Sequence, residues 1–134
     1  MATFFQKIID REIPATIVYE DDQAVAFKDI NPGAPFHVLV IPKKPLVNVG
    51  AMAPEDEQLV GHCLLVCQKV AGEAGLSDFR VVTNNGEGAG QSVFHLHFHV
   101  IPAYEGVELG RHGQGKADDA ELAAQAKAIA AALG

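Results

Sequence analysis

Several features that would assign this sequence to a protein class are scarce or missing. Only two of its 134 residues are cysteine, none is tryptophan, and 17 acidic residues outnumber ten basic ones, giving a net charge of −7. Two cysteines cannot build a disulfide framework, and the charge repels nucleic-acid polymers and anionic membranes. The N-terminal MATFFQKIIDREIP has neither a signal-peptide apolar region nor a bilayer span. We therefore expect a cytoplasmic protein whose partners include no nucleic-acid polymer and no membrane.

The rest of the composition is that of one globular domain. Hydrophobic residues make up 49% of the chain and charged residues 20%, which is typical of soluble domains. Cys63 and Cys67 lie four residues apart in a helical apolar pattern, so we expect small core residues and no zinc knuckle. His62 falls near the polar side of the same pattern, where an ordinary exposed histidine is expected.

Apolar periodicity and turn residues predict an α+β order of elements. Thr3 can cap a short helix, a long helix spans 54–74 with Gly75 suited to its C-terminal cap, and a last helix begins near Asp118 or Asp119. Strands are expected at 16–19, 24–27, 36–41, 79–83 and 93–102. Hairpin-length connections among these strands favour a mainly antiparallel sheet.

The most informative stretch is 93–102, VFHLHFHVIP. In a β-strand, successive side chains point to opposite faces. His95, His97 and His99 share one parity, so a strand here places three imidazoles on one face. The other face then carries an apolar ridge that we expect to be core: Phe94, Leu96, Phe98 and Val100.

Three interpretations compete for the three histidines. They can be buried structural residues with satisfied ring nitrogens, metal ligands, or groups for nucleophilic and acid–base chemistry at phosphorus. In an ideal strand His95 and His99 lie roughly 13 Å apart, too far to share one ion. Only neighbours two residues apart, with an outside ligand, could chelate one. This spacing disfavours a metal site without excluding such a pair, and we predict no metal and no cofactor.

The run from His95 to Ile101 resembles the His-x-His-x-His-x-x signature of the histidine triad (HIT) family of nucleotide hydrolases and transferases. The likeness extends from about Phe4 to Pro102, so 1–134 is expected to be a single HIT domain with a divergent C-terminal segment, 103–134. The resemblance implies a five-stranded sheet with helices, and a homodimer that joins two sheets into ten strands. The Cys-x-x-Cys zinc motif of some members is absent here, which favours no structural metal.

The resemblance implies a catalytic role for five residues. His97, central among the three, matches the family's nucleophile. The others position the phosphoryl oxygens or lie near the leaving group: His95, His99, His37 and Ser92.

The resemblance also implies a set of nucleotide-binding residues. Asp29 matches the family's ribose-binding carboxylate, and its sequence context favours that role over the alternative of a turn former beside Asn-Pro-Gly. The glycine-rich loop carries Asn84, Gln91 and Ser92 toward the phosphate, unless it is only a tight connection. The remaining members are apolar residues, of which the first two could simply anchor the first helix: Phe5, Ile8, Phe27 and Ile30.

These residues lead to an expected reaction, the hydrolysis of nucleoside 5′-monophosphate derivatives through a nucleotidyl-histidine. The pair Gln91-Ser92 before the triad favours a purine nucleoside phosphoramidase, which cleaves P–N bonds of AMP or GMP derivatives. The alternatives are a dinucleoside polyphosphate hydrolase and a nucleotide-binding protein without catalysis.

Overall fold

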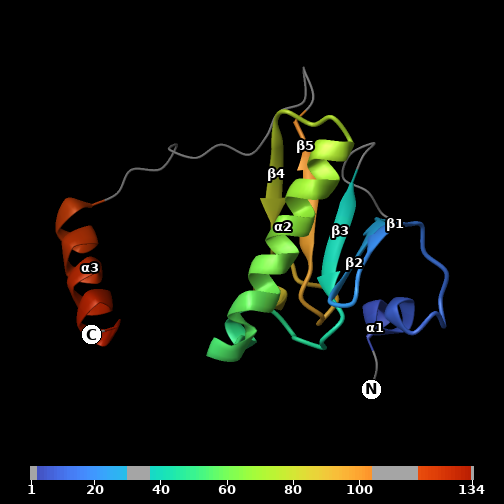
Figure 1. Cartoon of the computed structure of the whole chain (residues 1–134). Coiled ribbons are helices and arrows are strands. Elements are labelled where there is room, and N and C mark those ends of the chain that lie inside the picture. Colours follow the sequence, from blue (N-terminus) through green and yellow to red (C-terminus); the bar gives the residue numbers. More distant parts are fainter. Residues whose placement is uncertain (1–2, 30–36, 104–117, 134) are drawn as a thin grey trace.

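A computed structural model describes residues 3–29, 37–103 and 118–133. Five strands form one antiparallel sheet in the order β1-β2-β3-β5-β4 (Figure 1). Their bounds are Ile17–Glu20 for β1, Ala24–Lys28 for β2, Val38–Pro42 for β3, Phe79–Val82 for β4 and Phe98–Pro102 for β5. The predicted α+β class and its mainly antiparallel five-stranded sheet are confirmed.

Helix α2, Glu57–Glu73, covers one face of the sheet. Cys63 and Cys67 point into the core beneath it, beside Val38, Val40 and Val100 of β3 and β5, and their prediction as core residues is confirmed. A 3₁₀ turn at Pro54–Asp56 precedes the helix. Just after the C-cap Ala74, Gly75 has φ +73°, a left-handed conformation that glycine adopts without strain.

Helix α1, Phe4–Ile9, packs on the opposite face. Thr3 caps it as expected, because its hydroxyl accepts a hydrogen bond from the Gln6 amide at 3.1 Å. Phe5 and Ile8 are buried against alternate residues of β2 and β3: Val25, Phe27, Leu39 and Ile41. Both central strands are therefore buried on two faces, which makes them the rigid part of the domain.

The strand expected at 93–102 is shorter in the structure, because β5 begins only at Phe98. Residues 93–97 do not join the ladder, and the Leu96 amide donates instead to the Leu46 carbonyl at 2.6 Å. Leu96, Phe98 and Val100 are buried as predicted, but Phe94 is 47% exposed, so its prediction as core was wrong. The alternation rule fails there because it holds only along an extended strand.

Helix α3, Asp119–Leu133, begins where it was expected. The Asp118 carboxylate accepts hydrogen bonds from the Ala120 and Glu121 amides. The described side chains of α3 are exposed, including Leu133 at 82%, and Figure 1 draws the helix apart from the sheet. None of the described helices is both long and apolar enough to span a membrane.

The prediction of His62 as an ordinary exposed histidine was wrong. Its Nε2 lies 2.6 Å from the Asp21 carboxylate, which also accepts from the Tyr19 hydroxyl at 2.9 Å and from the Gln23 and Ala24 amides at 2.8 Å. Burial alone raises the pKa of Asp21, but these donors together hold it well below its usual range. The carboxylate thereby ties the β1–β2 turn to α2.

We predict that Asp21→Asn lowers the free energy of unfolding at pH 7 by about 1–3 kcal/mol. Because the folded pKa is depressed, this stabilisation is complete above the unfolded pKa of 3.8 and is lost as the pH falls through the folded pKa. Urea unfolding at pH 7 and at pH 3 measures the difference. The exposed neighbour Asp22→Asn is the matched control, and equal losses for the two variants at pH 7 would contradict the prediction.

Candidate active site

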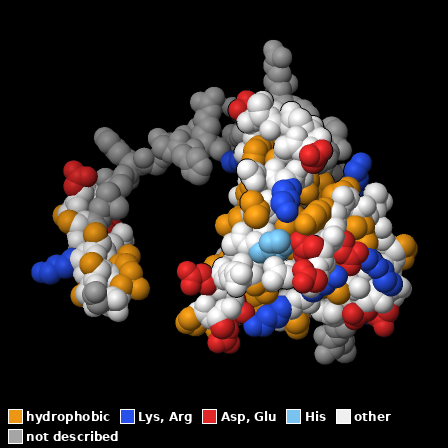
Figure 2. All heavy atoms as spheres, in the orientation of Figure 1, with side chains coloured by type: hydrophobic (Ala, Val, Ile, Leu, Met, Phe, Trp, Pro, Cys, Tyr) orange, Lys and Arg blue, Asp and Glu red, His pale blue; other side chains and the backbone are white. Residues whose placement is uncertain are grey.

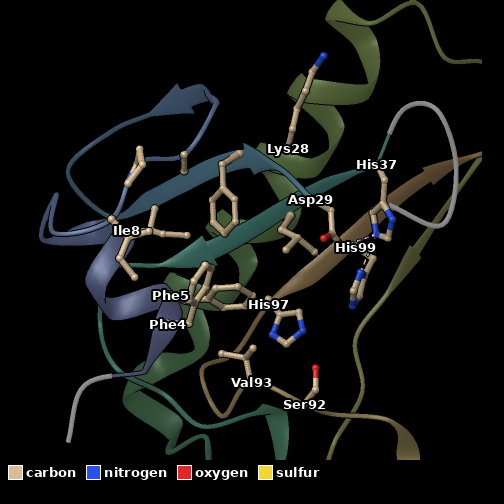
Figure 3. Close-up of a pocket in the computed structure, with 15 residues that line it drawn as sticks. Phe4, Phe5, Ile8, Lys28, Asp29, His37, Ser92, Val93, His97 and His99 are labelled. Carbon is tan, nitrogen blue, oxygen red and sulfur yellow. Dashed lines mark hydrogen bonds and ion pairs between the residues drawn. The ribbon is translucent and has the colours of Figure 1, made fainter. Parts of the chain in front are cut away.

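A cavity of about 660 Å³ opens on the α1 face of the sheet. One wall is apolar and is formed by Phe4, Phe5, Ile8, Ile13, Pro14, Ala15, Phe27, Leu39 and Val93. The other end is polar and is formed by Lys28, Asp29, His37, Ser92, His97 and His99 (Figure 3). A flat apolar group and an anionic group can therefore occupy opposite ends of one cavity.

The strand register explains how the polar end forms. Leu39 of β3 pairs with Phe27 of β2 and with His99 of β5, so these three side chains share the α1 face. One step beyond β2, the Asp29 amide donates to the His37 carbonyl at 2.8 Å and continues the pairing. Asp29, His37 and His99 consequently converge at one corner of the sheet.

His37 and His99 are coupled through their rings. His37 Nε2 lies 2.8 Å from His99 Nδ1 and 3.5 Å from the Asp29 carboxylate. A proton on His37 Nε2 satisfies both neighbours, and His99 then carries its own proton on Nε2. Burial lowers the pKa of His99 to about 4 and also lowers that of His37, although Asp29 opposes it. Both rings are neutral at pH 7 and His99 can donate one hydrogen bond.

A backbone carbonyl determines which ring nitrogen of His97 carries the proton. Its Nδ1 lies 2.7 Å from the His95 carbonyl, which can only accept, so Nδ1 holds the proton and Nε2 keeps its lone pair. The ring meets Phe5 edge to face at 4.9 Å. Burial lowers the pKa of His97 below its ordinary 6.5. His97 is therefore a neutral base or nucleophile at the cavity wall.

His95 is placed differently from the expectation that it faces a phosphoryl group. Its side chain is 1% exposed, and Nε2 donates to the Pro42 carbonyl at 2.7 Å. It does not line the cavity. The alternation of side chains places His95 on the same face as His97 only in an extended strand. Residues 93–97 do not form such a strand. Its contribution to the site is the carbonyl that fixes the His97 tautomer.

The glycine-rich loop delivers only one of its three expected residues to the cavity. Ser92 lines it, whereas neither Gln91 nor Asn84 belongs to the lining. Gln91 is 2% exposed and bonded to the surrounding backbone. Ile30, also expected to bind nucleotide, lies outside the described residues.

The apolar wall contains residues that sequence reasoning missed. Ile13, Pro14 and Ala15 follow α1 and close the cavity beside the expected Phe5 and Ile8. Leu39 could have been found from its parity with His37, since the two residues lie two apart on one strand. No sequence pattern marks the 13–15 segment as a cavity wall.

Asp29, His37 and His99 could also bind a metal ion. One ligand atom from each lies within 4.8 Å of the others, and no other group of three His, Cys, Asp or Glu in the described part of the chain meets that condition. Two imidazoles and a carboxylate with an open position suit a divalent transition ion. The sequence argument considered only chelation built on two histidines of the 93–102 strand, His95 with His99 or a pair two residues apart with an outside ligand, so it did not foresee this group.

Comparisons with known proteins agree with this geometry. Residues 10–106 match the HIT domain. An uncharacterised HIT-like protein of Synechocystis sp. is 60% identical over 100 residues, which are 74% of this chain and 88% of that protein. A HIT family hydrolase from Clostridium thermocellum is 44% identical over 82% of this chain and 95% of its own, with a TM-score of 0.75.

A protein of Streptococcus mutans UA159 matches over 98% of this chain and 85% of its own, with 31% identity and a TM-score of 0.85. Taken with the HIT domain match, which spans most of the chain, these similarities identify the family. The chain belongs to the HIT domain family, as the His-x-His-x-His run predicted.

Proposed function

We propose that this protein is a hydrolase that cleaves purine nucleoside 5′-monophosphate derivatives through a nucleotidyl-His97 intermediate. The observation that carries the proposal is His97: its Nδ1 proton is bonded to the His95 carbonyl, so the Nε2 lone pair is left for the cavity. A neutral imidazole with one defined lone pair is a nucleophile for phosphorus. The similar chain from Clostridium thermocellum is described as a HIT family hydrolase.

The two ends of the cavity suit the parts of a nucleotide. A purine is flat and apolar on its faces, and the wall that includes Phe5, Ile8 and Phe27 is apolar. Asp29, at the polar end, is a carboxylate that can accept from both ribose hydroxyls. Ser92 and His99 can donate to the phosphate and the leaving group. Among the described lining residues Lys28 is the one cationic side chain.

The reaction runs in two displacements. His97 Nε2 attacks the α-phosphorus, the bond to the leaving group breaks, and the leaving group takes a proton from a donor such as Ser92. Water then attacks the phosphorus and gives a proton to the Ser92 oxygen, which restores the hydroxyl, while the bond to Nε2 breaks and the nucleoside monophosphate leaves. His99 Nε2–H stabilises the phosphoryl oxygens in both steps. These side chains supply the acid, the nucleophile and the donors, so the mechanism requires no cofactor.

A phosphoramidate is the preferred substrate class. The leaving amine of a P–N bond must be protonated, and the Ser92 hydroxyl lies at the cavity rim where it can take part. A dinucleoside polyphosphate is the second candidate and shares the first displacement. Side-by-side kcat/KM for adenosine phosphoramidate and diadenosine tetraphosphate decides between them.

We also propose a homodimer, which two apolar surfaces support. Leu64 and Leu65 of α2 are 48% and 47% exposed, and Phe79 and Val81 of the edge strand β4 are 37% and 39% exposed. Val81 pairs with Val100, whose side chain packs beneath α2, so the β4 pair shares the α2 face. Figure 2 shows hydrophobic side chains on this side of the molecule. Such a surface is suited to a second copy.

We predict that His97→Ala abolishes both turnover and the covalent adduct, with a loss of about 10³-fold or more. His99→Ala should slow the reaction and still allow an adduct. Intact-mass spectrometry after acid-free quenching, followed by peptide mapping, detects the nucleotidyl-imidazole, and the configuration at phosphorus should be retained. His62→Ala, outside the cavity, is the matched control. An adduct that persists without His97, or net inversion, would contradict the mechanism.

We predict a ribonucleotide preference that depends on Asp29. A 2′-deoxy substrate leaves the carboxylate without one donor. The activation free energy for kcat/KM should therefore rise by about 1–3 kcal/mol, and kcat/KM should fall accordingly. The preference should shrink in Asp29→Asn and persist in Asp22→Asn. Equal kcat/KM for ribo and deoxy substrates with the unaltered protein would remove this role.

We predict a dimer at micromolar concentration that Leu65→Glu weakens, because a buried unpaired charge opposes association. Sedimentation equilibrium measures the mass, and the exposed Gln68→Glu on the same helix is the control. A mass of 14.2 kDa for the unaltered chain would exclude the dimer.

A further inference from the structure

Residues 91–97 carry three cavity side chains, those of Ser92, Val93 and His97, but are not held by the sheet. The first ladder partner in β5 is Phe98, which pairs with Val40. Ser92 and His97 both lie before that point and both line the cavity. Other interactions must therefore fix the backbone that presents them.

Gln91 supplies four such interactions from one buried amide. Its Nε2 donates to the Val47 carbonyl at 2.7 Å and to the Val93 carbonyl at 3.1 Å. Its Oε1 accepts from Asn48 Nδ2 at 3.0 Å and from the Gly86 amide at 2.8 Å. A side-chain amide has two donor hydrogens and two acceptor lone pairs, so its capacity is fully used.

The sequence resemblance implied that Gln91 binds phosphate directly. A side-chain amide whose four hydrogen bonds are already made, and which does not line the cavity, is poorly suited to that role. Binding would break one of the four bonds and leave a buried polar group without its partner. The effect of Gln91 on the site must therefore come through the backbone it holds.

The residue held most directly is Ser92. On one side of it, the Gln91 amide donates to the Gly86 carbonyl at 3.0 Å. On the other side, the Gln91 side chain reaches past Ser92 to the Val93 carbonyl. The Gly90–Gln91 and Val93–Phe94 peptide units, which bracket the short segment that carries Ser92, are thus both bonded through Gln91. In Figure 3 the Ser92 hydroxyl points toward the cavity near His97.

Asn48 is the second member of this arrangement. Its Nδ2 donates to Gln91, while its Oδ1 accepts from the Ala51 amide at 3.1 Å and caps a 3₁₀ turn. Nearby, the Gly50 amide donates to Asn85 Oδ1 at 3.0 Å. The 48–51 turn, distant from the triad in sequence, is thereby joined to the loop that leads into it.

We infer that Gln91, held by Asn48, is a positioning residue that fixes the Ser92 hydroxyl at the leaving-group side of the cavity. This inference rests on the proposed function, in which Ser92 donates to the departing amine. Gln91 touches neither substrate nor phosphate and acts only by determining where Ser92 lies. Its loss should affect kcat through Ser92 and leave nucleotide affinity nearly unchanged.

The test is a double-mutant cycle with adenosine phosphoramidate. Gln91→Glu keeps an acceptor for Asn48 and Gly86 but replaces the donors to the two carbonyls with oxygen. It should lower kcat by about 10- to 100-fold in the otherwise unaltered protein, because small displacements of an aligned group are costly. In a Ser92→Ala background the same change should cost less than about threefold, because the positioned hydroxyl is already absent.

Two further measurements separate positioning from general damage to the fold. Asn48→Ala removes one of the four bonds, and it should give a smaller kcat loss that also disappears in the Ser92→Ala background. The dissociation constant of AMP should change by less than about threefold when Gln91 or Asn48 is altered, compared within the same Ser92 or Ser92→Ala background. The exposed Gln68→Glu is the matched control for the Gln-to-Glu change.

The outcomes are distinct. Strong dependence of the Gln91 and Asn48 effects on Ser92, with AMP affinity preserved, supports the inference. Equal losses in both backgrounds, or losses that appear mainly in AMP affinity, overturn it while the proposed function stands. Absence of turnover and adduct in the unaltered protein overturns the proposed function and, with it, this inference.

Discussion

The site depends on a short chain of hydrogen bonds that begins at the end of β3. The Pro42 carbonyl accepts from the His95 ring, and the His95 carbonyl accepts from the His97 ring. A histidine attacks only through the nitrogen without a proton, so the second bond decides which nitrogen of His97 is available. The first bond keeps the carbonyl of the second in place. Two neutral hydrogen bonds thus connect a strand buried on both faces to the His97 ring in the cavity wall.

The surroundings of the histidines decide their charge. Burial disfavours the imidazolium form and lowers the pKa of His95, His97, His99 and His37. A cluster of four charged rings would repel itself and attract phosphate without reacting with it. Neutral rings allow one member to act as a nucleophile while its neighbours donate single hydrogen bonds. The Asp29 carboxylate lies beside them. It raises the pKa of His37, but by less than burial lowers that pKa.

Much of this arrangement could be predicted from the sequence, because periodicity reports burial directly. Apolar spacing and capping residues such as Thr3 predict the helices α1 and α2 on the two faces of the sheet. They also predict the five strands and the core cysteines. The resemblance carried by the His-x-His-x-His run indicated the family and many of the cavity residues, but it also assigned to the site three residues that do not line the cavity: His95, Gln91 and Asn84. Errors arose where tertiary contacts replaced the ladder. Phe94 and His95 were misplaced because residues 93–97 bond to other segments, and His62 because its partner Asp21 is 41 residues away in sequence. Gln91 bonds to Val47 and Asn48, and no pattern in the chain announces that pairing.

The two cysteines beneath α2 carry a chemical consequence beyond packing. Burial raises the pKa of each thiol to about 12, with the neighbouring Cys67 adding to the effect at Cys63. Oxidants and alkylating reagents attack the thiolate, which is a negligible fraction of either residue at neutral pH. The core under α2 therefore does not depend on a reducing environment, and the proposed imidazole nucleophile would be equally independent of redox conditions.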